Sequence, residues 1–307
     1  MFEWQQASCQ ANFHLDSTDL GLRYRTETCI GQANRWHPVE LHSHGQWRSL
    51  NFLTYSHRMA STQPAVTYSS YLRVEELLDL QKPLSIGPEH DELLFIIIHQ
   101  SYELWFKSIL HELERTQREL EAGKTHNALA LLGRVRTILK VLVSQVDILE
   151  TMTPLQFNSF RDRLEAASGF QSAQFRELEA VFGRRDPAMV SHLPEGESRQ
   201  RVESAMQRNS LWESVLAYLK IRGHVGGSDI NQMLISVYRN DAESASVLEK
   251  LVDIDEGLQE WRYRHVKMVE RTIGRKIGTG GSSGAQYLAS TLFNPVFPNL
   301  WEIRSKF

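Results

Sequence analysis

From residue 67 to the C-terminus, apolar side chains recur every three to four residues, which is the spacing of amphipathic helices. One run, Leu93–Ile98, is apolar on nearly all sides and predicts a helix buried in a core. Gly87-Pro88 and Gly123 bound this helix, which gives it about 34 residues and a length of roughly 51 Å. A second long proline-free helix is expected over residues 243–273. No segment alternates strongly between apolar and polar positions, so the sequence predicts an all-α, bundle-like domain with two long core helices.

Shorter helices are expected between these two, with recognisable start and stop signals. Thr153-Pro154 is typical of an N-cap followed by a first-turn proline, and Ser210-x-x-Glu213 forms a capping box. Thr125 is expected to cap a helix, and Gly183 to end one. The predicted helices cover residues 67–82, 125–152, 153–167, 171–182 and 210–222, whereas the loops within 187–253 stay undefined.

Residues 1–66 differ from the rest of the chain. They hold five of the twelve histidines, both cysteines and three of the seven tryptophans, without a countable period. This composition favours a disordered leader, or a start codon placed too early with Met59 as the true start, over an N-terminal domain. The expected folded domain therefore spans residues 67–307.

Charge and cysteine usage narrow the function classes. With 34 basic and 37 acidic residues the net charge is −3, which indicates neither a nucleic acid nor an acidic membrane as partner. The sequence contains no stretch of 18 consecutive apolar residues, so it predicts no transmembrane helix. Because both cysteines, Cys9 and Cys29, precede residue 67, the main domain has no disulfide, no Cys-ligated metal and no cysteine nucleophile. A cytoplasmic location is expected, and a metal centre would need His, carboxylate or Tyr ligands.

Two histidines on the two long predicted helices carry the candidate chemistry. His99 follows the apolar run, and His265 has Leu258, Trp261 and Met268 as helical neighbours. Each alone is most simply a hydrogen-bonded core histidine. Together they suggest a haem pocket, with one as the axial ligand. The chain has no His-Glu-x-x-His pattern, which argues against a zinc protease.

Two further features have an ordinary and a functional interpretation. Arg161 follows Phe160 and forms either a surface ion pair or a bidentate clamp on a substrate carboxylate. The glycine-rich segment 274–284 is either a flexible connector or a loop whose backbone N–H groups and Thr279 hydroxyl close over a small ligand. It follows a helix and lacks the lysine of a phosphate-binding P-loop.

Several ordered motifs together resemble the tryptophan 2,3-dioxygenase family over roughly three quarters of the chain. The segments that carry the resemblance are Tyr68-Ser-Ser-Tyr71, His90-Asp-Glu-Leu-Leu-Phe95-Ile-Ile-Ile-His99-Gln, Glu103-Leu-Trp105-Phe-Lys107, Leu149-Glu-Thr-Met-Thr153-Pro154, Phe160-Arg161-Asp162, Ser168-Gly169-Phe170-Gln171-Ser172, Trp261-Arg-Tyr-Arg-His265 and Gly278-Thr279-Gly-Gly-Ser-Ser-Gly284.

The resemblance implies a role for each matching residue of the haem and indole sites. His265 matches the axial ligand of the haem iron, and His99 matches the distal histidine that contacts the indole N–H. Phe95 matches an aromatic residue that packs on the indole. Ser168 and Gly169 match the turn beside the haem on its oxygen side.

The remaining matches concern the amino-acid end of the substrate. Arg161 matches the carboxylate clamp, and Thr279 the hydroxyl that engages the ammonium or carboxylate group. Tyr68 and Tyr71 match residues that reach the pocket of a neighbouring subunit. Phe157 stands where some bacterial members have tyrosine, so a carboxylate contact is lost there.

The implied activity is haem-dependent conversion of L-tryptophan and O2 to N-formyl-L-kynurenine, the first step of tryptophan degradation. The implied assembly is a homotetramer with one haem b per subunit. Two alternatives are a relative that monooxygenates a tryptophan derivative and a non-catalytic haem-binding helical protein. A haem-binding protein without catalysis needs no carboxylate clamp, so Arg161 and Thr279 argue against it.

Overall fold

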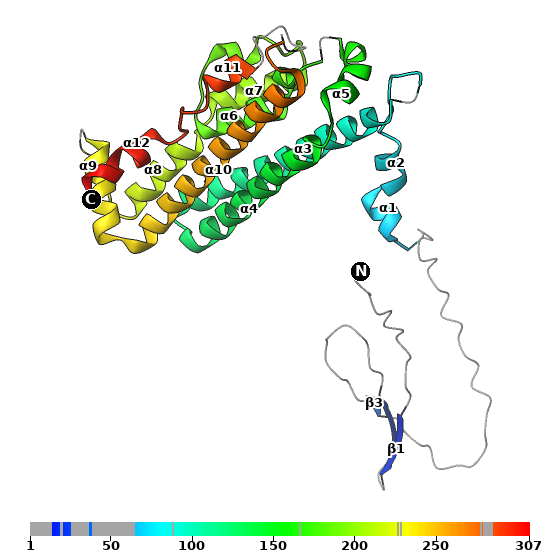
Figure 1. Cartoon of the computed structure of the whole chain (residues 1–307). Coiled ribbons are helices and arrows are strands. Elements are labelled where there is room, and N and C mark those ends of the chain that lie inside the picture. Colours follow the sequence, from blue (N-terminus) through cyan, green and yellow to red (C-terminus); the bar gives the residue numbers. More distant parts are fainter. Residues whose placement is uncertain are drawn as a thin grey trace, which may run out of the picture. The chain divides into compact units, whose positions relative to one another are not determined.

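The protein divides into two compact units, residues 1–66 and 67–307. The computed structural model describes residues 14–18, 21–25, 37–38, 65–87, 89–165, 167–225, 227, 229–276, 278 and 285–307. Figure 1 shows the helices of the second unit.

The first unit contains three short antiparallel strands in the order β1-β2-β3. In β1 and β2, His14 pairs with Arg25 and Thr18 with Gly21. These strands were not predicted from the sequence. The segment His-Leu-Asp-Ser-Thr of β1, for example, has a single large apolar side chain, so it shows no alternation of apolar and polar positions. Their bounds are β1 His14–Thr18, β2 Gly21–Arg25 and β3 His37–Pro38.

The described residues of the second unit form only helices and their connections, which confirms the predicted all-α fold. The α-helices are α1 Tyr68–Leu72, α2 Val74–Leu78, α3 Asp91–Glu121, α4 Thr125–Leu149, α5 Pro154–Arg161, α6 Ala173–Phe182, α7 Glu197–Gln207, α8 Leu211–Ile221, α9 Ile230–Asn240, α10 Ala242–Ile273, α11 Ala285–Ala289 and α12 Pro298–Glu302. Short 3-10 helices cover Asp162–Leu164, Gly169–Gln171, Pro187–Val190 and Ile303–Lys306. None of the helices in these residues could cross a membrane.

Three long helices build the core. α4 packs against both α3 and α10, and α3 also contacts α6 and α8 (Figure 1). Fully buried side chains such as Ile109, Leu132 and Leu251 come from each of the three. Burial of such side chains stabilises the fold by about 1.5–3 kcal/mol each. The two long helices expected from the sequence, α3 and α10, are therefore confirmed as core helices.

Several helix ends differ from the expectations. The first predicted helix is interrupted at Arg73, whose φ of 52° is left-handed and separates α1 from α2. α3 begins at Asp91 rather than at Pro88, which lies outside the described residues. Thr125 does not cap α4: it is the first helical residue, and its hydroxyl hydrogen-bonds the Tyr218 hydroxyl at 2.9 Å.

The predicted caps at Thr153 and Ser210 are confirmed as capping boxes, and Gly183 ends α6 at a φ of 115°. Helices α7 and α9 lie in the region that the sequence left undefined. The signal for α9 was present: Asp229 accepts hydrogen bonds from the first-turn amides of Asn231 and Gln232.

Candidate functional site

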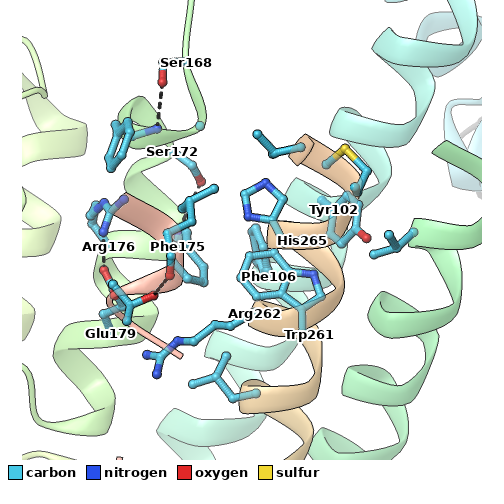
Figure 2. A pocket seen from close by; sticks show the side chains of 18 of the residues that line it. Tyr102, Phe106, Ser168, Ser172, Phe175, Arg176, Glu179, Trp261, Arg262 and His265 are labelled. Carbon is cyan, nitrogen blue, oxygen red and sulfur yellow. Dashed lines mark hydrogen bonds and ion pairs between the residues drawn. The ribbon is translucent and has the colours of Figure 1, made fainter. Parts of the chain in front are cut away.

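A cavity of about 1130 Å³ lies in the second unit, between α3, α5, α6 and α10 (Figure 2). Ligand pockets usually measure about 300–1,000 Å³, so this cavity has room for more than one small molecule. Its wall includes seven of the ten residues singled out by the sequence: Phe95, His99, Phe157, Arg161, Ser168, Gly169 and His265.

His265 projects from α10 into this cavity (Figure 2). Burial lowers the pKa of its imidazole to about 4, so the ring is neutral at physiological pH. Within the described part of the chain its ring nitrogens have no hydrogen-bond partner, although its ring stacks on Trp261 with centroids 5.4 Å apart. A neutral imidazole with a free lone pair is the usual protein ligand of haem iron. The residues present therefore fit the implied group.

His99 lies on α3 and also faces the cavity. Its Nδ1 is 2.7 Å from the carbonyl oxygen of Phe95, and since a carbonyl only accepts, Nδ1 must carry the proton. Burial lowers the pKa of His99, which favours the neutral ring. By accessible area the residue is exposed, and it lines the cavity. In the neutral ring Nε2 is consequently a hydrogen-bond acceptor.

An aromatic cluster surrounds His99. The ring centroid of Phe95 lies 4.0 Å from that of His99, 5.8 Å from that of Phe157 and 5.5 Å from that of Phe160. Flat apolar walls of this kind accommodate an aromatic ligand. Arg161, the last residue of α5, lines the same cavity as this cluster. The site thus combines an apolar wall, a hydrogen-bond acceptor and a guanidinium.

The turn with Ser168 and Gly169 forms another part of the wall. Ser168 caps the 3-10 helix by accepting a hydrogen bond from the Phe170 amide at 3.4 Å. The residues that follow this turn are held by Glu103 of α3. Its carboxylate accepts hydrogen bonds from Ser172 Oγ at 2.5 Å and from Gln174 Nε2 at 2.8 Å. Glu103 belongs to the motif Glu103-Leu-Trp105-Phe-Lys107, but the sequence indicated no role for its carboxylate.

Three predicted site residues are not in this wall. Thr279 lies outside the described residues, although Gly278 beside it borders the cavity. Tyr68 and Tyr71 project from α1 and are each 77 % exposed, so the pocket of their own chain does not include them.

A buried carboxylate that the sequence did not indicate holds one part of the cavity wall. Asp255 on α10 is fully buried and accepts hydrogen bonds from the amides of Val296 and Phe297 and from Trp301 Nε1, at 2.9–3.0 Å. Val296 and Phe297 line the cavity. Asp255 therefore holds the C-terminal segment in place as a wall.

Comparisons with known proteins agree with this arrangement. A family model described as tryptophan 2,3-dioxygenase matches residues 54–220 and 221–307. The tryptophan 2,3-dioxygenase of Herpetosiphon aurantiacus is 56 % identical over an alignment 256 residues long, and the match covers 78 % of this chain and 98 % of the relative. That of Anaeromyxobacter sp. is 56 % identical over an alignment 255 residues long, and the match covers 78 % of this chain and 96 % of the relative. That of Nocardioides sp. is 43 % identical over 267 residues, with coverages of 83 % and 98 %.

Proposed function

The chain belongs to the tryptophan 2,3-dioxygenase family, and we propose from this membership that it converts L-tryptophan and O2 to N-formyl-L-kynurenine. Both oxygen atoms enter the product while the C2–C3 bond of the indole breaks, so the reaction balances without an external reductant. The observation that carries the proposal is the presence of His265, His99 and Arg161 in the wall of one cavity.

Haem b is the proposed cofactor, with His265 as its axial ligand. The neutral imidazole of His265, whose nitrogens have no hydrogen-bond partner among the described residues, and the size of the cavity support this assignment. Bound haem would supply the iron at which O2 is activated. Ser168 and Gly169 are proposed to border it on the oxygen side. The chain's own contribution is to hold the substrate in a reactive orientation.

The other residues would orient the substrate. Nε2 of neutral His99 would accept the indole N–H, while Phe95 and Phe157 pack against the ring. Arg161 would bind the carboxylate through two parallel hydrogen bonds. Thr279 is proposed to engage the amino-acid end from its loop. These contacts would hold the indole and the amino-acid end of the substrate in one orientation within the cavity.

A homotetramer is proposed in which α1 reaches a neighbouring subunit. The arm formed by α1 and α2 leaves the bundle in Figure 1, and Tyr68, Tyr71, Leu72 and Leu78 are exposed on it. Exposed apolar patches of this kind mark interaction surfaces. The mass of the haem-loaded protein in solution, measured by light scattering, tests the assembly.

Product analysis tests the proposed activity. Reduced, haem-loaded protein is mixed with L-tryptophan and 18O2, and the product is analysed by mass spectrometry. Two 18O atoms in N-formylkynurenine are expected. A product with a single 18O atom would instead indicate monooxygenation, and unchanged tryptophan would indicate a non-catalytic haem protein.

A matched variant tests the cofactor. His265→Ala is expected to lose stoichiometric haem, or to retain a site that added imidazole restores. An unchanged ferrous haem spectrum in this variant would contradict the axial assignment. His111→Ala, on α3 and outside the cavity wall, serves as the control.

A further inference from the structure

Three side chains of α3 form a row along the cavity. Phe95, His99 and Glu103 are spaced four residues apart, so they leave the same face of the helix one turn after another, and all three line the cavity. The first two are proposed to hold the indole. Glu103 has no part in that mechanism, although its negative charge partly offsets the lowering of the pKa of His99 by burial.

The Glu103 carboxylate binds the start of α6 through both of its oxygens. Ser172 Oγ donates to Oε1 at 2.5 Å, and Gln174 Nε2 donates to Oε2 at 2.8 Å. Gln174 Nε2 also donates to the backbone carbonyl oxygen of Glu103, at 2.9 Å. These hydrogen bonds join residues that are 69 and 71 positions apart, and they fix the first turn of α6 against the row that includes His99.

Ser172 connects this contact to the turn of Ser168 and Gly169. Its amide donates to the Gly169 carbonyl oxygen at 3.2 Å, and its Oγ accepts a hydrogen bond from the Phe175 amide at 3.2 Å. Figure 2 shows Ser168 and Ser172 on the side of the pocket that α6 forms. The turn, the N-cap of α6 and the Glu103 carboxylate therefore make up one hydrogen-bonded unit.

We infer that Glu103 is a positioning residue that sets the separation between His99 and the turn of Ser168 and Gly169. This inference rests on the proposed function, in which His99 holds the indole and the turn borders the oxygen side of the haem. Both carboxylate oxygens already accept hydrogen bonds from α6, so Glu103 acts through the turn and not on a ligand. A misplacement of reacting groups by about 1 Å can cost about 100-fold in rate.

Variants on both sides of the contact separate positioning from a direct action of the carboxylate. Glu103→Gln replaces one acceptor oxygen by an N–H2 group. Gln174→Leu removes a donor that lies outside the cavity wall and leaves the carboxylate in place. The matched control is Glu112→Gln, because the Glu112 carboxylate also links α3 to another helix, accepting from Arg134 of α4 at 2.9 Å, outside the cavity wall.

Two measurements are made on the haem-loaded protein. The first is the C–O stretching band in the infrared spectrum of the ferrous carbon monoxide complex with tryptophan bound, which reports the surroundings of a ligand on the oxygen side. The second is steady-state kinetics with tryptophan, in which kcat and KM are determined separately, because loss of positioning lowers kcat while loss of binding raises KM.

Glu103→Gln is expected to shift or broaden the C–O band and to lower kcat about 10- to 100-fold with an unchanged KM for tryptophan. Gln174→Leu should change both in the same direction but less, because the hydrogen bond from Ser172 remains. The double variant should lose little more than Glu103→Gln alone, since both changes delete the same contact. Glu112→Gln should keep the band and the kcat of the wild type.

A wild-type band and kcat in Gln174→Leu would overturn the inference, whatever Glu103→Gln does, because the carboxylate would then not act through α6. Equal changes in Glu112→Gln would overturn it as well, and so would a rise in KM without a change in kcat. If Glu103→Gln does not fold, the comparison of Gln174→Leu with Glu112→Gln decides in the same way. A wild type that binds no haem or leaves tryptophan unchanged would instead refute the proposed function.

Discussion

The indole of Trp261 lies parallel to the imidazole of His265, with 9° between the ring planes and 5.4 Å between the centroids. Both residues project from α10, one turn apart. Trp261 is held in turn by Phe175, at 5.2 Å, and by Tyr102, at 6.2 Å. Within the described residues, the buried Trp261 Nε1 has no hydrogen-bond partner. One face of the imidazole thus lies against the indole of Trp261.

Replacement of Trp261 is expected to loosen the axial ligand. Stacked aromatic pairs contribute about 0.5–1.5 kcal/mol beyond the area that they bury, which corresponds to roughly two- to tenfold in affinity. Trp261→Leu should therefore raise the haem dissociation constant by about this factor, whereas Trp261→Phe keeps a stacking ring and should stay near wild type. Equal affinity in both variants would show that the stacking does not position His265.

Asp255→Asn is expected to destabilise the C-terminal wall. Asparagine keeps one acceptor oxygen but turns an N–H2 group toward the amide and indole donors that Asp255 binds. Loss of charged hydrogen bonds in a buried site should cost about 2–4 kcal/mol, or roughly 4–16 °C in Tm. Calorimetry of the protein measures the change.

The matched control for this experiment is Asp253→Asn. The Asp253 carboxylate is partly exposed and pairs with Lys250 and Arg136. Such pairs contribute about 0–1 kcal/mol, so the Tm should change little. Equal losses in the two variants would contradict the structural role of Asp255.

Hydrogen bonds between residues far apart in the chain, such as those of Asp255, could not be predicted from the sequence. Asp255 binds Val296 and Trp301, which are 41 and 46 positions away, and Glu103 binds Gln174 across 71 positions. Contacts between single polar side chains at such separations leave no periodic trace.

Local signals were more informative. The long helices α3 and α10 follow from apolar repeats without interior proline, and the cap at Thr153 follows from its own side chain. The left-handed break at Arg73 has no signal, because neither glycine nor asparagine stands there.

The pH dependence of activity should report the neutral state of His99. Burial lowers the pKa of this histidine below its ordinary value of 6.5. Protonation would turn the Nε2 acceptor into a donor and remove the site for the indole N–H. Because the shift is downward, kcat/KM for tryptophan should stay level as the pH falls to 6.5 and should decline only below it.

His99→Gln provides the comparison, since its amide oxygen can accept an N–H but does not titrate. This variant should lack the acidic decline that the wild type shows. A wild-type decline centred at pH 6.5 or above, absent from His99→Gln, would contradict the lowered pKa.

Residues 1–66 are expected to be dispensable for catalysis. They form a compact unit of their own, and the matches to the relatives from Herpetosiphon, Anaeromyxobacter and Nocardioides cover 78–83 % of this chain. A protein that starts at Met59 should bind haem and turn over tryptophan like the full chain. Haem content and kcat/KM of the two forms provide the measurement. Loss of either in the shorter form would show that the first unit contributes to the site.

Substitution of Arg161 tests whether this residue binds the carboxylate of the tryptophan substrate. A bidentate pair of guanidinium and carboxylate is planar and directional, so lysine cannot replace arginine without loss. Truncation of one partner in a desolvated pocket costs about 2–5 kcal/mol, or roughly thirty- to several-thousand-fold in kcat/KM. Arg161→Lys and Arg161→Ala should lose activity on tryptophan with haem content nearly unchanged. The exposed neighbour Arg163 is the control, and Arg163→Ala should retain activity.

Tryptamine, which lacks the carboxylate, separates a clamp from a structural role. It should be a poor substrate of the wild type and should lose little more in Arg161→Ala, because both changes delete the same interaction from opposite sides. If tryptamine loses as much as tryptophan, Arg161 acts through the packing of α5, where Phe157 and Phe160 are buried beside it. If the wild type uses both substrates equally well, the protein does not bind the carboxylate, and recognition of the amino-acid end must come from other residues.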